Sequence, residues 1–82
     1  MITHVAILWN GTLYSLPKPK RHHDVINLIH EKTGDEGIFG VQGFITDNGV
    51  FLDRVDGRNY ALNIGQITTT LHVRHLFSED LW

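Results

Sequence analysis

The sequence predicts a small α+β domain built from two β-hairpins and two helices, in the order β-β-α-β-β-α. Three observations predict this class. An Asn-Gly pair follows an apolar run at residues 10–11 and again at residues 48–49, apolar residues recur at helical spacing after Arg21, and Asp53 is suited to cap a second helix. With 82 residues, the chain is expected to form one domain over residues 1–82.

The first hairpin is predicted from two strand-like stretches joined by a turn. Residues 2–9 are rich in β-branched and apolar side chains, and they run into Asn10-Gly11, a pair that tolerates the positive φ angles of a type I′ turn. Residues 12–16 supply the returning strand. Because the two prolines that follow disfavour helix in the residues before them, Pro17–Lys20 is expected to be an extended connector.

The first helix is predicted from Arg21 to about Thr33. Its apolar side chains recur at helical spacing, and Gly34 can adopt the left-handed conformation that ends a helix. The apolar positions are Val25, Ile26, Leu28 and Ile29.

The second half of the chain repeats this order of elements with a different sequence. Residues 42–46 and 50–52 flank a turn at residues 47–49, which predicts the second hairpin. Asp53 can cap a second helix that runs to Ile64.

Glycines and β-branched residues shape the prediction for the rest of the chain. Gly57 weakens the second helix by about 1 kcal/mol relative to alanine, and Gly65 would end it. The β-branched stretch Ile67–Val73 favours an additional C-terminal strand. The segment Leu76–Trp82 is apolar enough that it should dock on the domain.

Composition restricts the classes of partner. A net charge of −2 leaves no basic field for long nucleic acid. The longest apolar run, Val5–Trp9, is too short to span a membrane, so a cytoplasmic protein is expected. The absence of cysteine excludes disulfides and thiolate zinc sites. A small domain without such reinforcement is expected to be a homo-oligomer.

The tetrapeptide Arg21-His22-His23-Asp24 is the strongest candidate for a chemical site. It follows the basic segment Pro17–Lys20 and opens the predicted first helix. A helix N-terminus offers free N–H groups and a positive dipole end to a phosphate, and imidazoles titrate near neutral pH. We therefore expect phosphate binding and proton transfer here.

His22 and His23 suggest a metal-independent cleavage chemistry. A helix N-terminus with neighbouring cations should lower the pKa of His22, whose neutral ring could then accept a proton. One imidazole would take the proton of a ribose 2′-hydroxyl, and the other would protonate the leaving oxygen. Arg21 or Lys20 would stabilise the phosphorane charge. This chemistry needs no cofactor.

A structural role explains the same residues equally well, with His22 packed in the core and His23 in solvent. Binding without catalysis is a further alternative. His72-x-x-His75 could complete a zinc site with this pair, but such spacing is not specific, and we predict no metal.

Residues outside the tetrapeptide could contact a ligand as well. Arg54 and Arg58 lie one turn apart and could clamp a phosphate, with pairing to neighbouring carboxylates as the ordinary alternative. Trp82 could stack on a base, and Glu79-Asp80 could accept hydrogen bonds from a base edge or ribose. Trp9 and Trp82 could equally anchor a protein partner.

Four motifs spread over nearly the whole chain give it a resemblance to a widespread family of small phage and prophage proteins. The motifs are Leu16-Pro17-x-Pro19-x-Arg21-His22-His23-Asp24-x-Ile26, Gln42-Gly43-Phe44-x-Thr46-x-x-Gly49-x-Phe51-x-x-Arg54, Gly65-Gln66-Ile67 and Leu76-Phe77-Ser78-Glu79-Asp80-Leu81-Trp82. Similar proteins usually carry an acidic, alanine-rich stretch where this chain reads Val55-Asp56-Gly57-Arg58, a departure that affects the second helix.

By analogy, the resemblance implies a protein of the host cell cytoplasm that acts on nucleotide signals of bacterial defence. The leading prediction is a phage counter-defence protein that binds a cyclic nucleotide immune signal and cleaves it with His22 and His23. One alternative is a non-catalytic sponge for a cyclic nucleotide or an ADP-ribose-derived signal. Another is an inhibitor that binds a host protein. The predicted ligand-binding residues are Lys20, Arg21, Asp24, Arg54, Gln66, Glu79 and Trp82.

Overall fold

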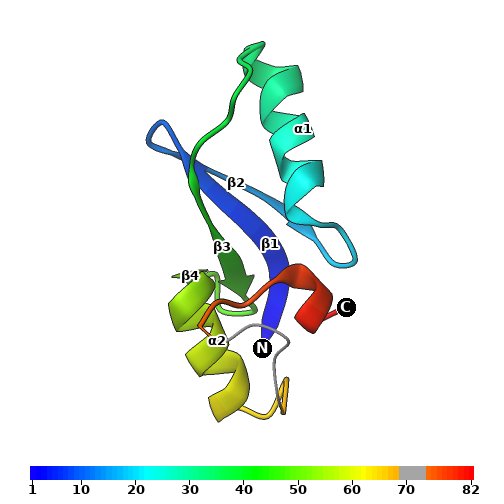
Figure 1. Ribbon diagram of the computed structural model, residues 1–82, viewed down its shortest axis with the longest axis vertical. Coiled ribbons are helices and arrows are strands. Elements are labelled where there is room, and N and C mark those ends of the chain that lie inside the picture. Colours follow the sequence, from blue (N-terminus) through cyan, green and yellow to red (C-terminus); the bar gives the residue numbers. More distant parts are fainter. Residues whose placement is uncertain (69–73) are drawn as a thin grey trace.

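The computed structural model describes residues 1–68 and 74–82 and confirms the predicted α+β class (Figure 1). A four-stranded antiparallel sheet carries two helices. The elements are β1 (Ile2–Trp9), β2 (Thr12–Pro17), α1 (His22–Thr33), β3 (Val41–Thr46), β4 (Phe51–Asp53), α2 (Arg54–Asn63) and the single 3-10 turn η1 (Ser78–Asp80). The additional strand predicted at residues 67–73 falls largely outside the described residues.

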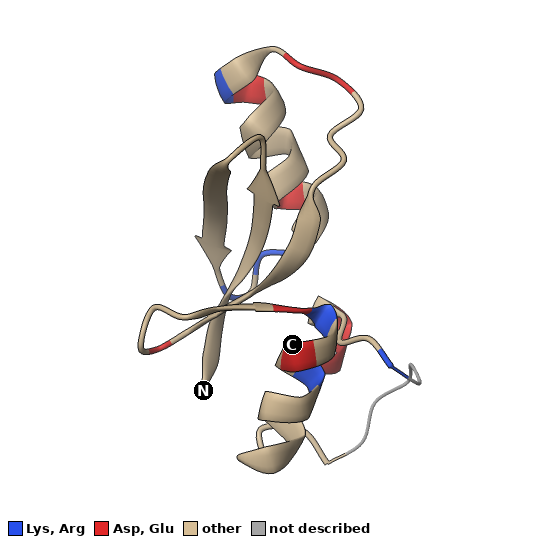
Figure 2. Cartoon of the chain, turned by 90° about the vertical axis from the view of Figure 1, so that its left-hand side faces the viewer, with Lys and Arg blue, Asp and Glu red and all other residues tan. Residues whose placement is uncertain are grey.

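The sheet has the strand order β2-β1-β3-β4, so each hairpin occupies one half of it. The first hairpin closes with Trp9 opposite Thr12. Asn10 and Gly11 have φ angles of 50° and 76°, which confirms the predicted turn with positive φ at both central residues. Figure 2 shows that the charged residues lie in the helices, the loops, the end of β4 and the C-terminal segment, while β1, β2 and β3 carry none.

Both helices pack on the same face of the sheet, at opposite ends of it (Figure 1). Helix α1 covers β1 and β2, and α2 covers β3 and β4. Phe44 of β3 lies between them and is fully buried. Its ring meets the His22 ring of α1 edge-on, with centroids 5.1 Å apart and planes at 80°. The core is therefore continuous from one helix to the other.

Gly57 lets α2 approach Phe44 closely. A Cβ at this position would lie 3.1 Å from Cδ2 of Phe44 and 3.5 Å from Cδ2 of Leu76. The helix propensity lost at Gly57 is thus offset by close packing, which explains why α2 forms around a glycine. Helix α2 begins as predicted, because the Asp53 side chain accepts a hydrogen bond from the Asp56 backbone N–H at 2.8 Å.

The C-terminal segment docks on its own chain, as the sequence predicts. Leu76 is fully buried, and its backbone N–H donates to the carbonyl of Arg54 at 2.9 Å. Ser78 is buried as well, and its Oγ accepts a hydrogen bond from Nη1 of Arg21 at 3.2 Å. The segment therefore joins the first turn of α2 to the start of α1.

The connector between β2 and α1 is a turn, so the prediction of an extended segment is wrong. The Lys20 backbone N–H donates to the carbonyl of Pro17 at 3.1 Å and folds the chain back. The Lys20 carbonyl in turn accepts a hydrogen bond from the Trp82 indole at 3.0 Å. The proline pattern excluded helix here, but it did not distinguish a turn from an extended path.

Replacing Gly57 should show how much the fold depends on this close approach. We expect Gly57→Val to lower the free energy of unfolding by roughly 1–3 kcal/mol, because the branched side chain would overlap the ring of Phe44. The matched control Asn59→Val, on an exposed position of α2, should change stability by less than about 0.5 kcal/mol. Urea unfolding measures both, and equal effects would contradict the packing role of Gly57.

Candidate functional site

The start of α1 is stabilised by Asp24 in a capping role. Its Oδ2 accepts a hydrogen bond from the extended backbone of Arg21 at 2.8 Å. This backbone hydrogen bond is the main reason why the pKa of Asp24 is lowered from its usual value. Asp24, one of the predicted ligand-binding residues, therefore already has a structural partner.

His22 lies in the core with 7% of its surface exposed. Its Nε2 is 2.8 Å from the carbonyl oxygen of Gly43, so Nε2 carries the proton and donates it. The pKa of His22 is lowered mainly by burial, and the nearby Arg54 cation lowers it further. The direction agrees with the sequence-based expectation, but the dominant cause is the apolar core.

Gly43 is required where His22 meets the sheet. A Cβ on Gly43 would lie 2.1 Å from the carbonyl oxygen of Leu52 and 2.8 Å from the Phe51 ring. No larger side chain fits between β3 and β4 at this point. The residue that accepts the His22 hydrogen bond must therefore be glycine, because any side chain there would clash.

His23 points away from the core, with 73% of its side chain exposed. Its Nε2 lies 3.4 Å from Oδ1 of Asp24. One imidazole of the predicted catalytic pair is therefore buried and the other is in solvent. Their joint role in cleavage stays a prediction.

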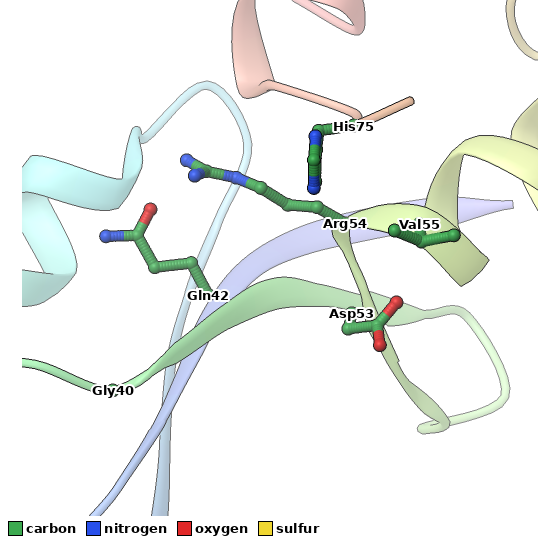
Figure 3. Close-up of a pocket in the computed structure, with 6 residues that line it drawn as sticks. All are labelled: Gly40, Gln42, Asp53, Arg54, Val55 and His75. Atoms are coloured by element: carbon green, nitrogen blue, oxygen red, sulfur yellow. The ribbon is translucent and has the colours of Figure 1, made fainter. Parts of the chain in front are cut away.

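An open pocket of about 410 Å³ lies between the first residues of β3, the start of α2 and the C-terminal segment (Figure 3). We call it the Arg54 pocket. Its lining residues are Gly40, Gln42, Asp53, Arg54, Val55 and His75.

Arg54 supplies the positive charge of this pocket. Its guanidinium carbon lies 4.2 Å from the centroid of the Phe77 ring, in a cation–π contact. Its Nε is buried without a hydrogen-bond partner among the described residues. Burial lowers the pKa of Arg54, whereas the charge of Glu79 raises it. The two ion pairs formed within the described part of the chain do not involve Arg54.

The polar neighbours of Arg54 in the pocket include the Gln42 amide, which can donate and accept hydrogen bonds, and the His75 ring. In Figure 3 the Arg54 side chain passes over the pocket, with the amide of Gln42 below its guanidinium and the His75 ring turned towards its stem. The Asp53 carboxylate points away from the guanidinium, and its Oδ1 is occupied by the Asp56 backbone N–H. The arrangement is suited to an anion held by the guanidinium and an amide.

The structure divides the other predicted ligand residues between two places. Lys20, Arg21 and Trp82 meet where α1 begins, next to Glu79 of the C-terminal segment. Gln66 lies elsewhere, because its amide bonds the backbone N–H and carbonyl of Ile2 at 2.7 and 2.9 Å. Only Arg54 of the predicted set lines the pocket.

Sequence reasoning missed Gln42 and His75 as pocket residues. A signal existed for Gln42, since alternation along a strand places it on the same face as Phe44. His75 had been considered only as a zinc ligand together with His72, which lies outside the described residues. Among the described residues, no group of three or more His, Asp or Glu could hold a metal ion. No helix there is long and apolar enough to cross a membrane.

The family model of the phage T4 y16D protein matches the chain over residues 1–82. The chain belongs to this family. The match confirms the phage part of the sequence-based resemblance, and it extends over the full set of motifs. No curated protein and no solved structure matches the chain. Since the family description names no activity, function has to be argued from the site.

The buried His22 should make stability depend on pH. Its pKa is lowered in the folded state from an ordinary 6.5, so the unfolded chain binds more protons as the pH falls through that value. The free energy of unfolding should therefore decrease between about pH 7.5 and pH 5. His22→Gln, which can still donate to Gly43 but does not titrate, should remove this slope.

The exposed His23 provides the matched control. His23→Gln should retain the wild-type slope in urea unfolding over the same pH range. An unchanged slope in His22→Gln would show that another group causes the pH dependence.

Proposed function

We propose that the protein binds a small phosphate-bearing ligand of the nucleotide class in the Arg54 pocket and holds it without cleaving it. One observation carries this proposal. The guanidinium of Arg54 faces an open pocket, is partly buried, and forms no ion pair with a carboxylate among the described residues.

The electrostatics of Arg54 support an anionic ligand. Burial disfavours the charged form of a guanidinium, and its pKa is lowered accordingly. A phosphate would replace the water that the guanidinium loses on burial, and its oxygens could accept two parallel hydrogen bonds from the planar guanidinium. Glu79 supplies only a partial, longer-range compensation.

The size and lining of the pocket support a nucleotide rather than a bare ion. Its volume of about 410 Å³ falls within the range of small-molecule pockets, about 300–1,000 Å³. Gln42 offers an amide donor and acceptor, and His75 offers an aromatic ring. Cyclic nucleotides and ADP-ribose-derived signals both present phosphates to such a site.

The surroundings of His22 favour holding over cleaving. As a general base, the imidazole would need to face the ligand, but its Nε2 bonds to Gly43 and its ring packs on Phe44. The His23 side chain is exposed to solvent, whereas the His22 ring is buried. Cleavage by this pair is the alternative, and the fate of the ligand after incubation distinguishes the two.

Membership of a phage family supports the biological setting of the proposal. A phage protein that sequesters a nucleotide immune signal would act in the host cytoplasm and weaken the defence that the signal triggers. In this role, the affinity for the ligand and the amount of protein determine the effect, and turnover is not needed.

Replacing Arg54 should weaken binding. With a panel of cyclic oligonucleotides and ADP-ribose signals, we expect calorimetry to show that Arg54→Met loses at least tenfold in affinity, about the value of one charge-assisted hydrogen bond. Arg58→Met, one turn further along α2, removes an equally long cation with a buried Nε outside the pocket. It should bind like the wild type.

The fate of the ligand separates the two functions. After incubation with chelator and heat denaturation, chromatography should return the ligand intact from a sponge. A product that disappears in His22→Gln would instead support cleavage. Equal affinity of the wild type and Arg54→Met would exclude the Arg54 pocket as the binding site.

A further inference from the structure

Within residues 1–68 and 74–82, strand β2 forms one edge of the sheet and pairs only with β1. The residues that flank a two-residue hairpin loop, here Trp9 and Thr12, form a hydrogen-bonded pair. Non-hydrogen-bonded and hydrogen-bonded pairs then alternate along the two strands. The backbone N–H and carbonyl groups of Leu13 and Ser15 therefore point outward. No described residue forms a hydrogen bond with them. The edge has open positions for another strand.

This edge lacks the usual protection against pairing. Residues 12–17 contain no charged side chain, although the whole chain carries a net charge of −2. Its one protective residue is Pro17 at the end of the strand. Figure 2 shows the same absence of charge on the neighbouring strand.

An apolar row leads from the interior of the sheet to this edge. The register places Leu8 opposite both Leu13 and Val41. The three side chains share one face of the sheet and are 39%, 43% and 50% exposed. This face lies opposite the one that bears the helices, since Val5 and Phe44 occupy the alternate positions.

We propose that β2 pairs antiparallel with β2 of a second copy of this chain. A two-fold axis at Tyr14 places Leu13 opposite Ser15 of the second copy, and Ser15 opposite its Leu13. Each of these two pairs can exchange two backbone hydrogen bonds. The two sheets join into one, and the two Leu13 side chains, which end the apolar rows of the two copies, lie diagonally across the axis on the same face.

The edge fits a second copy better than a foreign strand. Because Pro17 has no N–H, the outward donors of the strand are those of Leu13 and Ser15, and the two-fold register uses both. The strand offers no charge by which a charged partner could be recognised. Each copy carries a net charge of −2, but the two β2 strands carry no charge and can therefore pair without direct charge repulsion.

The second copy leaves the proposed ligand site open. The Arg54 pocket is lined by residues of β3, β4, α2 and the C-terminal segment, towards the sheet edge opposite β2. Pairing of the copies and ligand binding can therefore be tested separately, and the failure of one does not affect the other.

Cysteine cross-linking tests the register, because the chain has no cysteine of its own. In this register the two Tyr14 Cα atoms would be about 4.5 Å apart, within reach of a disulfide. Tyr14→Cys should therefore give a disulfide dimer on mild oxidation. In the matched control Thr12→Cys, the two cysteines would be about 13 Å apart and should cross-link at least tenfold more slowly.

Sedimentation velocity over a concentration series tests the association itself. A contact of this size is at the low end of specific interfaces, so the wild type should dimerise reversibly and dissociate on dilution. Leu13→Lys, which places a like charge beside the axis, should sediment as a folded monomer at every concentration and still bind ligand as the wild type does.

Two results would overturn the proposal. One is a wild-type protein that stays monomeric throughout the series. In that case β2 would pair with a strand of another protein or with no strand. The other is a dimer that persists in Leu13→Lys, or cross-links equally through residues 12 and 14, because such a dimer would use another surface.

Discussion

The buried ring of Phe44 is the contact on which the arrangement of this protein depends. Helix α1 contacts this ring edge-on through His22, and α2 approaches it closely because Gly57 has no side chain. The His22 imidazole brings a polar group into this contact, and the carbonyl of Gly43 accepts its hydrogen bond. A buried donor without this bond would cost about 1–3 kcal/mol, a large share of the stability of a small domain.

Among the described residues, Arg54 forms no ion pair with a carboxylate, and the capping of the helices helps to explain this. The C-terminal segment links the first turns of the two helices that pack on Phe44, and three capping aspartates accept hydrogen bonds from backbone N–H groups. Asp24 bonds to Arg21, Asp53 to Asp56, and Asp80 to Phe77. Capping thus occupies these carboxylates, while Arg54 rests on an aromatic ring and faces the pocket.

Local sequence signals were sufficient for the elements, and tertiary contacts decided the site. Asn10-Gly11 and Asp53 act within a few residues, so both the turn and the helix start could be predicted. The burial of His22 depends on where β3 lies, and the place of His75 depends on the path of the C-terminal segment. Neither follows from spacing along the chain. The turn at residues 18–20 escaped prediction because proline excludes helix without selecting an alternative.

Arg54 also connects the proposed ligand site to the core electrostatically. Its positive charge is one of the two causes that lower the pKa of His22, after burial. A phosphate on Arg54 would neutralise this charge and let the pKa of His22 rise towards its ordinary value. Ligand binding and proton uptake by the buried imidazole would then favour each other, because thermodynamic linkage is reciprocal. His22 would in this way respond to the ligand through charge, without leaving Gly43 and without contacting the phosphate.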